Sequence, residues 1–305
     1  MTATQQRAAD TKTGGLLFGI GAYGSWGLFP AFFPLLKPAG ALEVLAHRVV
    51  WTLVLMAVVL VVMHRVSDLR LITRRTWLLL VCASALISAN WVIYVYAVNN
   101  GHVVDAALGY FINPLVSVLL GVVIFRERLN RAQLVALLIA LAAVVLLSVE
   151  VGGAPVIALG LAASFGLYGA VKKVVPSDPR VSVAVEAGIA APFAIAYIAV
   201  LQLTGDGQFT NHGGGHVALM ILSGLITAVP LLFFAAAAQR LPLVTLGLLM
   251  YLTPAMQMTL GVVVDHEPMP TGRWIGFALI WVALAVFSGD ALRRARVDRR
   301  QELPG

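Results

Sequence analysis

Three ionisable side chains lie close together in one apolar stretch, LEVLAHRVVW, at Glu43, His47 and Arg48. Glu43 and His47 are four residues apart, so in a helix they share a face and the carboxylate can stabilise the protonated imidazole. Such a pair can take up and release a proton near neutral pH. Ionisable residues inside apolar helices are costly and usually functional. Glu43 and His47 are therefore candidates for carrying a proton.

Arg48 needs a different partner, because it is offset from the face that Glu43 and His47 share. If its helix begins near Ala39, Arg48 lies roughly 14 Å along it, close to the middle of a bilayer core about 30 Å thick. Glu186, the acidic residue of a later apolar stretch, is the repeat counterpart of His47 and a third candidate for proton coupling. Two interpretations stay open: Arg48 binds an anionic group of a substrate, or Arg48 and Glu186 form a static ion pair.

The elements that position these residues are apolar runs, each long enough to cross a membrane. The chain has 305 residues, of which 60% are hydrophobic and 11% charged, whereas soluble domains are about a quarter charged. A span needs roughly 20 apolar residues. We therefore predict an all-α integral membrane protein with ten transmembrane helices. The expected spans are residues 14–36, 39–63, 77–98, 106–125, 132–149, 151–171, 181–203, 217–239, 241–264 and 274–292.

Basic residues indicate the orientation of these spans. Of the 21 Lys and Arg residues, 18 fall in the two tails and in alternate connections on one side, and two fall on the other side. Because cytoplasmic loops carry the excess, both termini are expected in the cytoplasm. This topology explains the net charge of +7 better than a nucleic-acid partner does. The basic run 293–300 is expected to touch anionic membrane lipids.

The second half of the chain repeats the first. YFINPLVSVLLGVVIFRERL recurs as MYLTPAMQMTLGVVVDHEPM, so that Pro114, Gly121 and Glu127 return 140 residues later. GAYGSWGLF likewise matches GLAASFGLY. A unit of five spans is odd-numbered, so its two copies must have opposite orientations in the membrane. We expect two inverted five-helix repeats, residues 14–149 and 151–292, between tails at 1–13 and 293–305.

The repeated segments contain Pro114 and Pro254, each of which leaves a helix carbonyl without its usual donor. These kinks either shape helix packing or line a central path for a substrate. Glu127 and Glu267, at the ends of the two segments, are expected to stabilise helix N-termini.

Aromatic and amide side chains in otherwise aliphatic spans are candidates for holding an organic solute by stacking and hydrogen bonding. The alternative is that the aromatic residues lie at the membrane interface and the amides bridge helices. With Arg48, the candidates for substrate binding are Tyr23, Trp26, Asn90, Trp91, Tyr94, Asn113, Tyr168 and Gln257.

The segments YGSWGLFPAFF, LAHRVVW, ANWVIYVYAVNNG and ALGYFINPLVSVLLG, with the two repeated halves, resemble the EamA family of the drug/metabolite transporter superfamily, and within it the RarD group. The resemblance covers nearly the whole chain. It implies an inner-membrane secondary transporter, an exporter of small metabolites or drug-like solutes, without naming the substrate.

A membrane enzyme or a lipid flippase is the alternative. The sequence contains no HExxH, GxSxG or P-loop pattern, so we expect neither catalysis, a metal, a cofactor nor ATP hydrolysis. HGGGH, at residues 212–216, has two histidines four apart, but three glycines disfavour a helix, and we expect a flexible outer loop. A proton gradient is the default energy source.

Overall fold

The computed structural model describes residues 3–100, 102–151, 156–263 and 271–302, and within these ranges the regular structure is helical throughout. The first half contains α1 (Ala3–Gly27), α2 (Phe29–Phe32), the 3₁₀ helix η1 (Phe33–Leu36), α3 (Ala41–Val62), the 3₁₀ helix η2 (Val66–Leu71), α4 (Arg74–Asn99), α5 (Val103–Val123) and α6 (Arg131–Val151). The second half contains α7 (Val156–Val174), α8 (Pro179–Thr204), α9 (Gly213–Ala238), α10 (Leu243–Leu249), α11 (Leu252–Val263) and α12 (Thr271–Glu302).

Seven helices of the described chain are long and apolar enough to cross a membrane. Shorter apolar helical stretches occur at Arg131–Leu146, Leu243–Gln257 and Trp274–Asp290. The all-α prediction is therefore confirmed. The ten-span count stays a prediction. α1 and α12 also extend into the segments that the sequence assigned to the tails.

Prolines explain where two expected spans are interrupted. The run 14–36 is α1 followed by the short α2 and η1, each of which has a proline in its first turn. The run 241–264 is divided into α10 and α11, and the carbonyl of Met250, freed by Pro254, accepts a hydrogen bond from the Thr253 amide at 3.1 Å. Pro114, in contrast, lies inside the continuous helix α5. The two matched prolines thus act differently.

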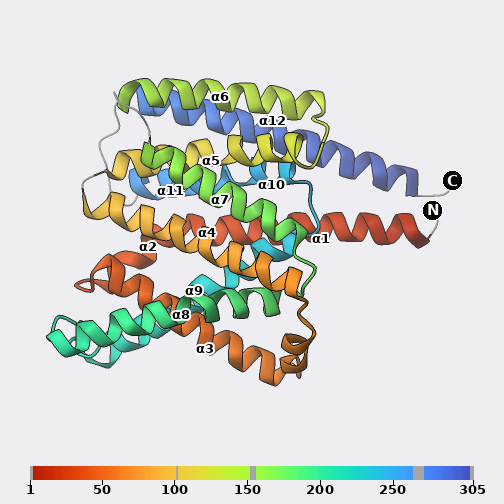
Figure 1. The fold of residues 1–305 in the computed structure, drawn as a ribbon. Helices are drawn as coiled ribbons and strands as arrows, with labels where there is room; N and C mark the ends of the chain where they lie inside the picture. The colour runs from red at the N-terminus through yellow and green to blue at the C-terminus, as the bar shows by residue number, and fades with distance from the viewer. Residues whose placement is uncertain (1–2, 101, 152–155, 264–270, 303–305) are drawn as a thin grey trace.

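The long helices lie side by side, and the N-terminus of α1 and the C-terminus of α12 are at the same end of the bundle (Figure 1). At one edge α6 packs on α12, and at the opposite edge α3 packs on α8 (Figure 1). Between the edges, α1 packs on α9, α4 on α7, and α5 on both α7 and α10. Each of these contacts joins an element of the first half to an element of the second.

Small residues permit the closest of these approaches. A Cβ added to Gly224 of α9 would lie 2.5 Å from the Cβ of Trp51 and 2.8 Å from the backbone nitrogen of Thr52, both in α3. The Thr52 hydroxyl also donates a hydrogen bond to the Gly224 carbonyl at 3.1 Å. The contact between α3 and α9 therefore depends on the missing side chain at Gly224, and it fixes the helix that carries Arg48.

Candidate binding site

Arg48 lies among aromatic rings contributed by α2, η1 and α4. Its guanidinium carbon is 5.2 Å from the ring centres of Phe33 and Trp91 and 5.5 Å from that of Phe29. Its Nε donates a hydrogen bond of 2.8 Å to the Thr227 hydroxyl of α9. Its two terminal nitrogens form no hydrogen bond or ion pair with a described residue. Arg48 is thus a part-buried cation with unused donors and aromatic walls.

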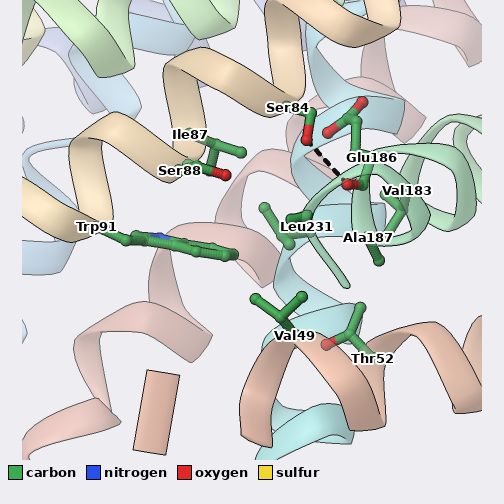
Figure 2. A pocket seen from close by; sticks show the side chains of 11 residues that line it. Val49, Thr52, Ser84, Ile87, Ser88, Trp91, Val183, Glu186, Ala187 and Leu231 are labelled. Carbon is green, nitrogen blue, oxygen red and sulfur yellow. Dashed lines mark hydrogen bonds between the residues drawn. The ribbon is translucent and has the colours of Figure 1, made fainter. Parts of the chain in front are cut away.

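A small cavity of about 20 Å³ lies next to this cage. It is enclosed by α3, α4, α8 and α9, and Trp91 belongs both to its lining and to the cage around Arg48 (Figure 2). Its volume is enough for about one water molecule. The lining residues include Val49, Thr52, Ser84, Ile87, Ser88 and Leu231. In this conformation the cavity is too small for an organic solute, so accommodating one requires the helices to move.

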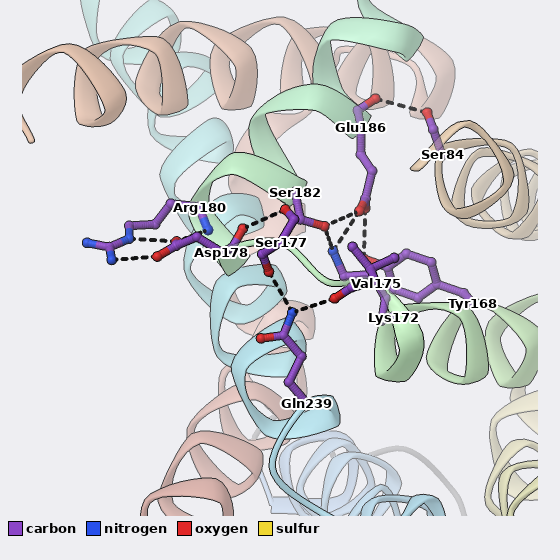
Figure 3. Close-up of polar contacts among 10 residues, drawn as sticks. All are labelled: Ser84, Tyr168, Lys172, Val175, Ser177, Asp178, Arg180, Ser182, Glu186 and Gln239. Carbon is purple, nitrogen blue, oxygen red and sulfur yellow. Dashed lines mark hydrogen bonds and ion pairs between the residues drawn. The ribbon is translucent and has the colours of Figure 1, made fainter. Parts of the chain in front are cut away.

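Glu186 also borders the cavity, but its carboxylate is held by α7 and its own helix rather than by Arg48 (Figure 3). Lys172 of α7 lies 2.6 Å from one carboxylate oxygen, and the Tyr168 hydroxyl donates to the other at 3.1 Å. Ser182 hydrogen bonds to both Lys172 and Glu186. The suggested static pair between Arg48 and Glu186 is therefore not formed. Lys172, which the sequence placed in a cytoplasmic connection, is fully buried.

Further hydrogen bonds stabilise the connection between α7 and α8, next to the Lys172–Glu186 pair. The Gln239 amide donates to the carbonyls of Ser177 at 2.8 Å and Val175 at 3.3 Å, which ties α9 to the connection between α7 and α8 (Figure 3). Asp178 precedes α8, and hydrogen bonds from Arg180 lower the pKa of its carboxyl below the usual value. The Lys172–Glu186 pair thus lies between the cavity and the hydrogen-bonded connection from α7 to α8.

Glu43 and His47 occupy the opposite end of α3, and they do not contact each other as an ion pair. The Glu43 carboxylate accepts hydrogen bonds from the backbone amides of Gln208 and Phe209, at 2.7 and 3.1 Å. The His47 ring stacks on Phe209 with 4.4 Å between ring centres. The helical spacing is as expected, but the carboxylate serves the connection between α8 and α9 instead of the imidazole.

The aromatic candidates form two groups. Tyr23 and Trp26 of α1 pack with Tyr168, Phe165 and Phe234, with ring centres 5.3 to 6.2 Å apart. Tyr94 packs separately against Tyr110 at 5.9 Å. Trp91 both contacts Arg48 with its ring and lines the cavity, and Tyr94 is close enough to Arg48 to act on its charge.

The amide candidates mainly join helices. Asn90 donates to the Leu161 carbonyl at 2.9 Å and to Ser164 at 3.0 Å, joining α4 to α7. Gln257 donates to the Trp26 carbonyl at 3.1 Å, joining α11 to α1. Asn113 is buried next to Pro114 with its carbonyl oxygen unpartnered. The Asn113 oxygen is thus a buried acceptor that no described residue satisfies.

Glu127 stabilises a helix N-terminus, though of a helix in the other half of the chain. Its two carboxylate oxygens accept hydrogen bonds of 2.8 Å from the amides of Leu243 and Val244, at the start of α10. Lys173 lies 3.3 Å from the same carboxylate. Glu267, its counterpart in the repeat, lies outside the described residues.

Comparison with known proteins assigns this architecture to a family. The model of the EamA-like transporter family matches the chain twice, at residues 13–149 and 153–289. The chain belongs to the EamA-like transporter family. It is 47% identical over 295 residues to Protein RarD of Streptomyces exfoliatus, with 96% of this chain and 94% of that protein covered.

Other EamA family relatives agree with this assignment. The chain is 40% identical to the uncharacterized transporter YojE of Bacillus subtilis, with 95% and 98% covered, and 37% identical to Protein RarD of Escherichia coli, with 92% and 96% covered. A solved crystal structure is similar with a TM-score of 0.69 at 20% identity, covering 90% of this chain and 96% of the other, which shows the fold alone. The chain is thus a membrane transporter of the drug/metabolite type.

Proposed function

We propose that the chain is a secondary transporter that exports a small organic solute with an anionic group across the inner membrane by alternating access. The observation that carries this proposal is the state of Arg48. A guanidinium in an apolar span is costly, and a carboxylate partner would be the simplest compensation. Arg48 has aromatic faces and one hydroxyl acceptor instead.

The chemistry of the cage defines what fits there. A guanidinium presents paired N–H groups that suit a carboxylate or phosphate, and those of Arg48 are unused. The rings of Trp91, Phe29 and Phe33 offer flat apolar surfaces to the rest of the solute. Lys172 and Glu186 compensate each other, so the cavity region carries the net positive charge of Arg48. A monoanionic solute with an apolar body matches this charge.

The arrangement of the two halves supports alternating access. If residues 14–149 and 151–292 are inverted repeats, α1, α3 and α4 correspond to α7, α8 and α9. The counterpart of the α1–α9 contact is then the contact between α7 and α4, and the counterpart of the α3–α9 contact is that between α8 and α4. Both members of each pair occur. The α3–α8 and α6–α12 contacts each join two corresponding helices, as expected for helices next to a two-fold axis. This pattern favours ten spans related by a pseudo-two-fold axis. Rocking of one half against the other would expose the cavity to each side in turn, with both termini cytoplasmic.

Proton coupling is part of the proposal. Glu43, His47 and Glu186 are the candidate groups, and the sequence has no ATP-binding loop. Glu43 and His47 lie at the end of the bundle away from the termini, and Glu186 borders the cavity on the other side.

The experiment begins with an untargeted comparison of metabolites in cells lacking and overproducing the protein. Candidate organic anions are then tested for efflux from proteoliposomes containing wild-type protein, Arg48→Gln or Arg48→Lys. We expect loss of at least about tenfold in transport for Arg48→Gln, equivalent to about 1.4 kcal/mol of lost binding. Arg48→Lys retains the charge without the planar fork and should be intermediate.

Arg65→Gln is the matched control, because Arg65 lies in a connection and pairs with Asp68 at 3.0 Å on the surface. It should transport like the wild type. Equal transport by Arg48→Gln and wild type, in protein with an unchanged unfolding midpoint, would exclude Arg48 as the anion site.

A further inference from the structure

The connection between α8 and α9, residues 205–212, lies against the end of α3 that is remote from the termini. It is fastened there by two contacts from α3. Glu43 accepts the amides of Gln208 and Phe209, and His47 stacks on the Phe209 ring. Trp51, one turn further along α3, lies 6.2 Å from the same ring. The segment therefore covers the end of the helix that carries Arg48.

Two buried histidines lie near this segment, one on α3 and one on α9. His47 is 4% exposed and His216 of α9 is 7% exposed, and the Nε2 atom of each is buried without a hydrogen-bond partner. His216 is close enough to His47 to act on its charge. An unpartnered imidazole nitrogen can remain buried while it is neutral. Two imidazolium ions at these positions would repel each other and lack acceptors.

Residues 212–216 form the start of a helix instead of the expected flexible loop, and this places His212 next to His216. The three glycines are helical, since α9 begins at Gly213, and His212 precedes it as the cap residue. The rings of His212 and His216 are consequently 5.5 Å apart, and His212 hydrogen bonds to the Gln208 side chain at 2.7 Å. The prediction of a flexible loop at this motif was wrong for these residues.

The charged groups that face His47 are few. Its own helix contributes Glu43 and Arg48, α9 contributes His216, and the covering connection contributes Asp206 and His212. After Glu186, α8 contributes the phenol of Tyr197, and the neighbouring half of α4 contributes those of Tyr94 and Tyr96. Glu43 is therefore the carboxylate that can compensate a protonated His47, since the two share a helix face. Both amides of the connection donate to the same oxygen, Oε1, so turning this carboxylate toward His47 would break both hydrogen bonds together.

We propose that His47 and His216 are the proton-binding pair on the outer side of the transporter, and that residues 205–212 form a lid that their protonation opens. A proton from the outer solution adds to Nε2 of each imidazole. The Glu43 carboxylate turns from the two amides to the imidazolium of His47, and the lid loses its fastening. The proposal rests on the proposed function in that the lid closes the outer end of the Arg48 site.

The direction of the pH effect follows from which state binds the proton. A hydrated imidazole ordinarily has a pKa of about 6.5, and burial without an acceptor disfavours the charged ring. The closed state is therefore fully favoured above about pH 6.5 and is lost as the pH falls below it. The opening equilibrium should rise roughly tenfold per pH unit for each proton bound, or about 100-fold for two.

Hydrogen exchange of the full chain in lipid nanodiscs tests this, because Glu43 accepts from the amides that would exchange. Protection factors for residues 205–212, corrected for the intrinsic effect of pH, should fall between pH 8 and pH 5.5. Amides in the middle of α9 should keep theirs. The double variant His47→Gln with His216→Gln should show constant protection, and each single variant about half the slope on a logarithmic scale.

His64→Gln is the control, because His64 is exposed at the other end of α3 and should leave the pH response unchanged. Constant protection of 205–212 in the wild type, or an equal fall in the double variant, would overturn the lid. If the double variant does not fold, the pH dependence of protection in the wild type and in the two single variants still tests the proposal. No solute is present, so failure here leaves the Arg48 efflux result standing, and failure of Arg48→Gln to impair efflux leaves the lid standing.

Discussion

Removing Lys172 should destabilise the transporter strongly. Lys172 and Glu186 are 2.6 Å apart, with 0% and 6% of their side chains exposed, so no solvent screens the pair. Deleting one partner of such a pair typically costs roughly 3–5 kcal/mol, because the other charge is left buried. We expect Lys172→Met to lie near the lower limit, since Tyr168 and Ser182 still donate to Glu186.

The assay is the thermal unfolding midpoint of purified protein in detergent at neutral pH. For a chain of this length about 1 kcal/mol corresponds to about 2 °C, so a cost near 3 kcal/mol for Lys172→Met should lower the midpoint by about 6 °C. Glu186→Gln should have a similar effect, because it leaves an uncompensated ammonium. The double variant should be destabilised much less than the sum of the single variants, which is the signature of direct coupling.

Arg65→Gln again provides the comparison. The pair between Arg65 and Asp68 has the same chemistry, but 46% of the Arg65 side chain is exposed, and such pairs contribute about 0–1 kcal/mol. If Lys172→Met lowers the midpoint no more than Arg65→Gln, or if the single effects simply add, the reasoning from the buried pair is wrong.

Two further predictions concern helix contacts. Gly224→Ala should cost roughly 1–3 kcal/mol of stability by overpacking, because the new methyl group meets the backbone of α3. Gly24→Ala, where an added Cβ has nothing within 4 Å, is the control in the same midpoint assay, and equal midpoints for the two variants would contradict the close approach. Glu127→Ala should cost about 1–2 kcal/mol by uncapping α10. A midpoint unchanged by this variant would show that the two amide contacts of Glu127 are replaced by solvent.

The helix positions were predictable because an apolar run of about 20 residues has few alternatives to a membrane helix. Interruptions within a run were less predictable. Pro114 and Pro254 occupy matched positions, yet Pro114 lies within a continuous helix and Pro254 follows a break. A proline's effect depends on whether neighbouring groups satisfy the freed carbonyl, which is a property of packing.

The site was predictable in its residue types but not in its pairings. Arg48 and Glu186 were identifiable as charges inside apolar spans. Lys172 was not, because it follows directly after an apolar run and was counted with the connection. Spacing predicts which residues share a helix face, as for Ser182 and Glu186, but it does not predict how that face is turned toward its neighbours.

The contacts of α3 also have a consequence for biogenesis. Arg48 reaches Thr227, 179 residues later in the chain, and Glu43 reaches the amides of residues 165 and 166 positions later. At about 5–20 residues per second, a ribosome needs roughly 9–36 seconds to supply Thr227 after Arg48. During that interval α3 lacks the hydrogen-bond partners that the second half supplies to Arg48 and Glu43. The insertion machinery must therefore shelter this helix until α8 and α9 arrive.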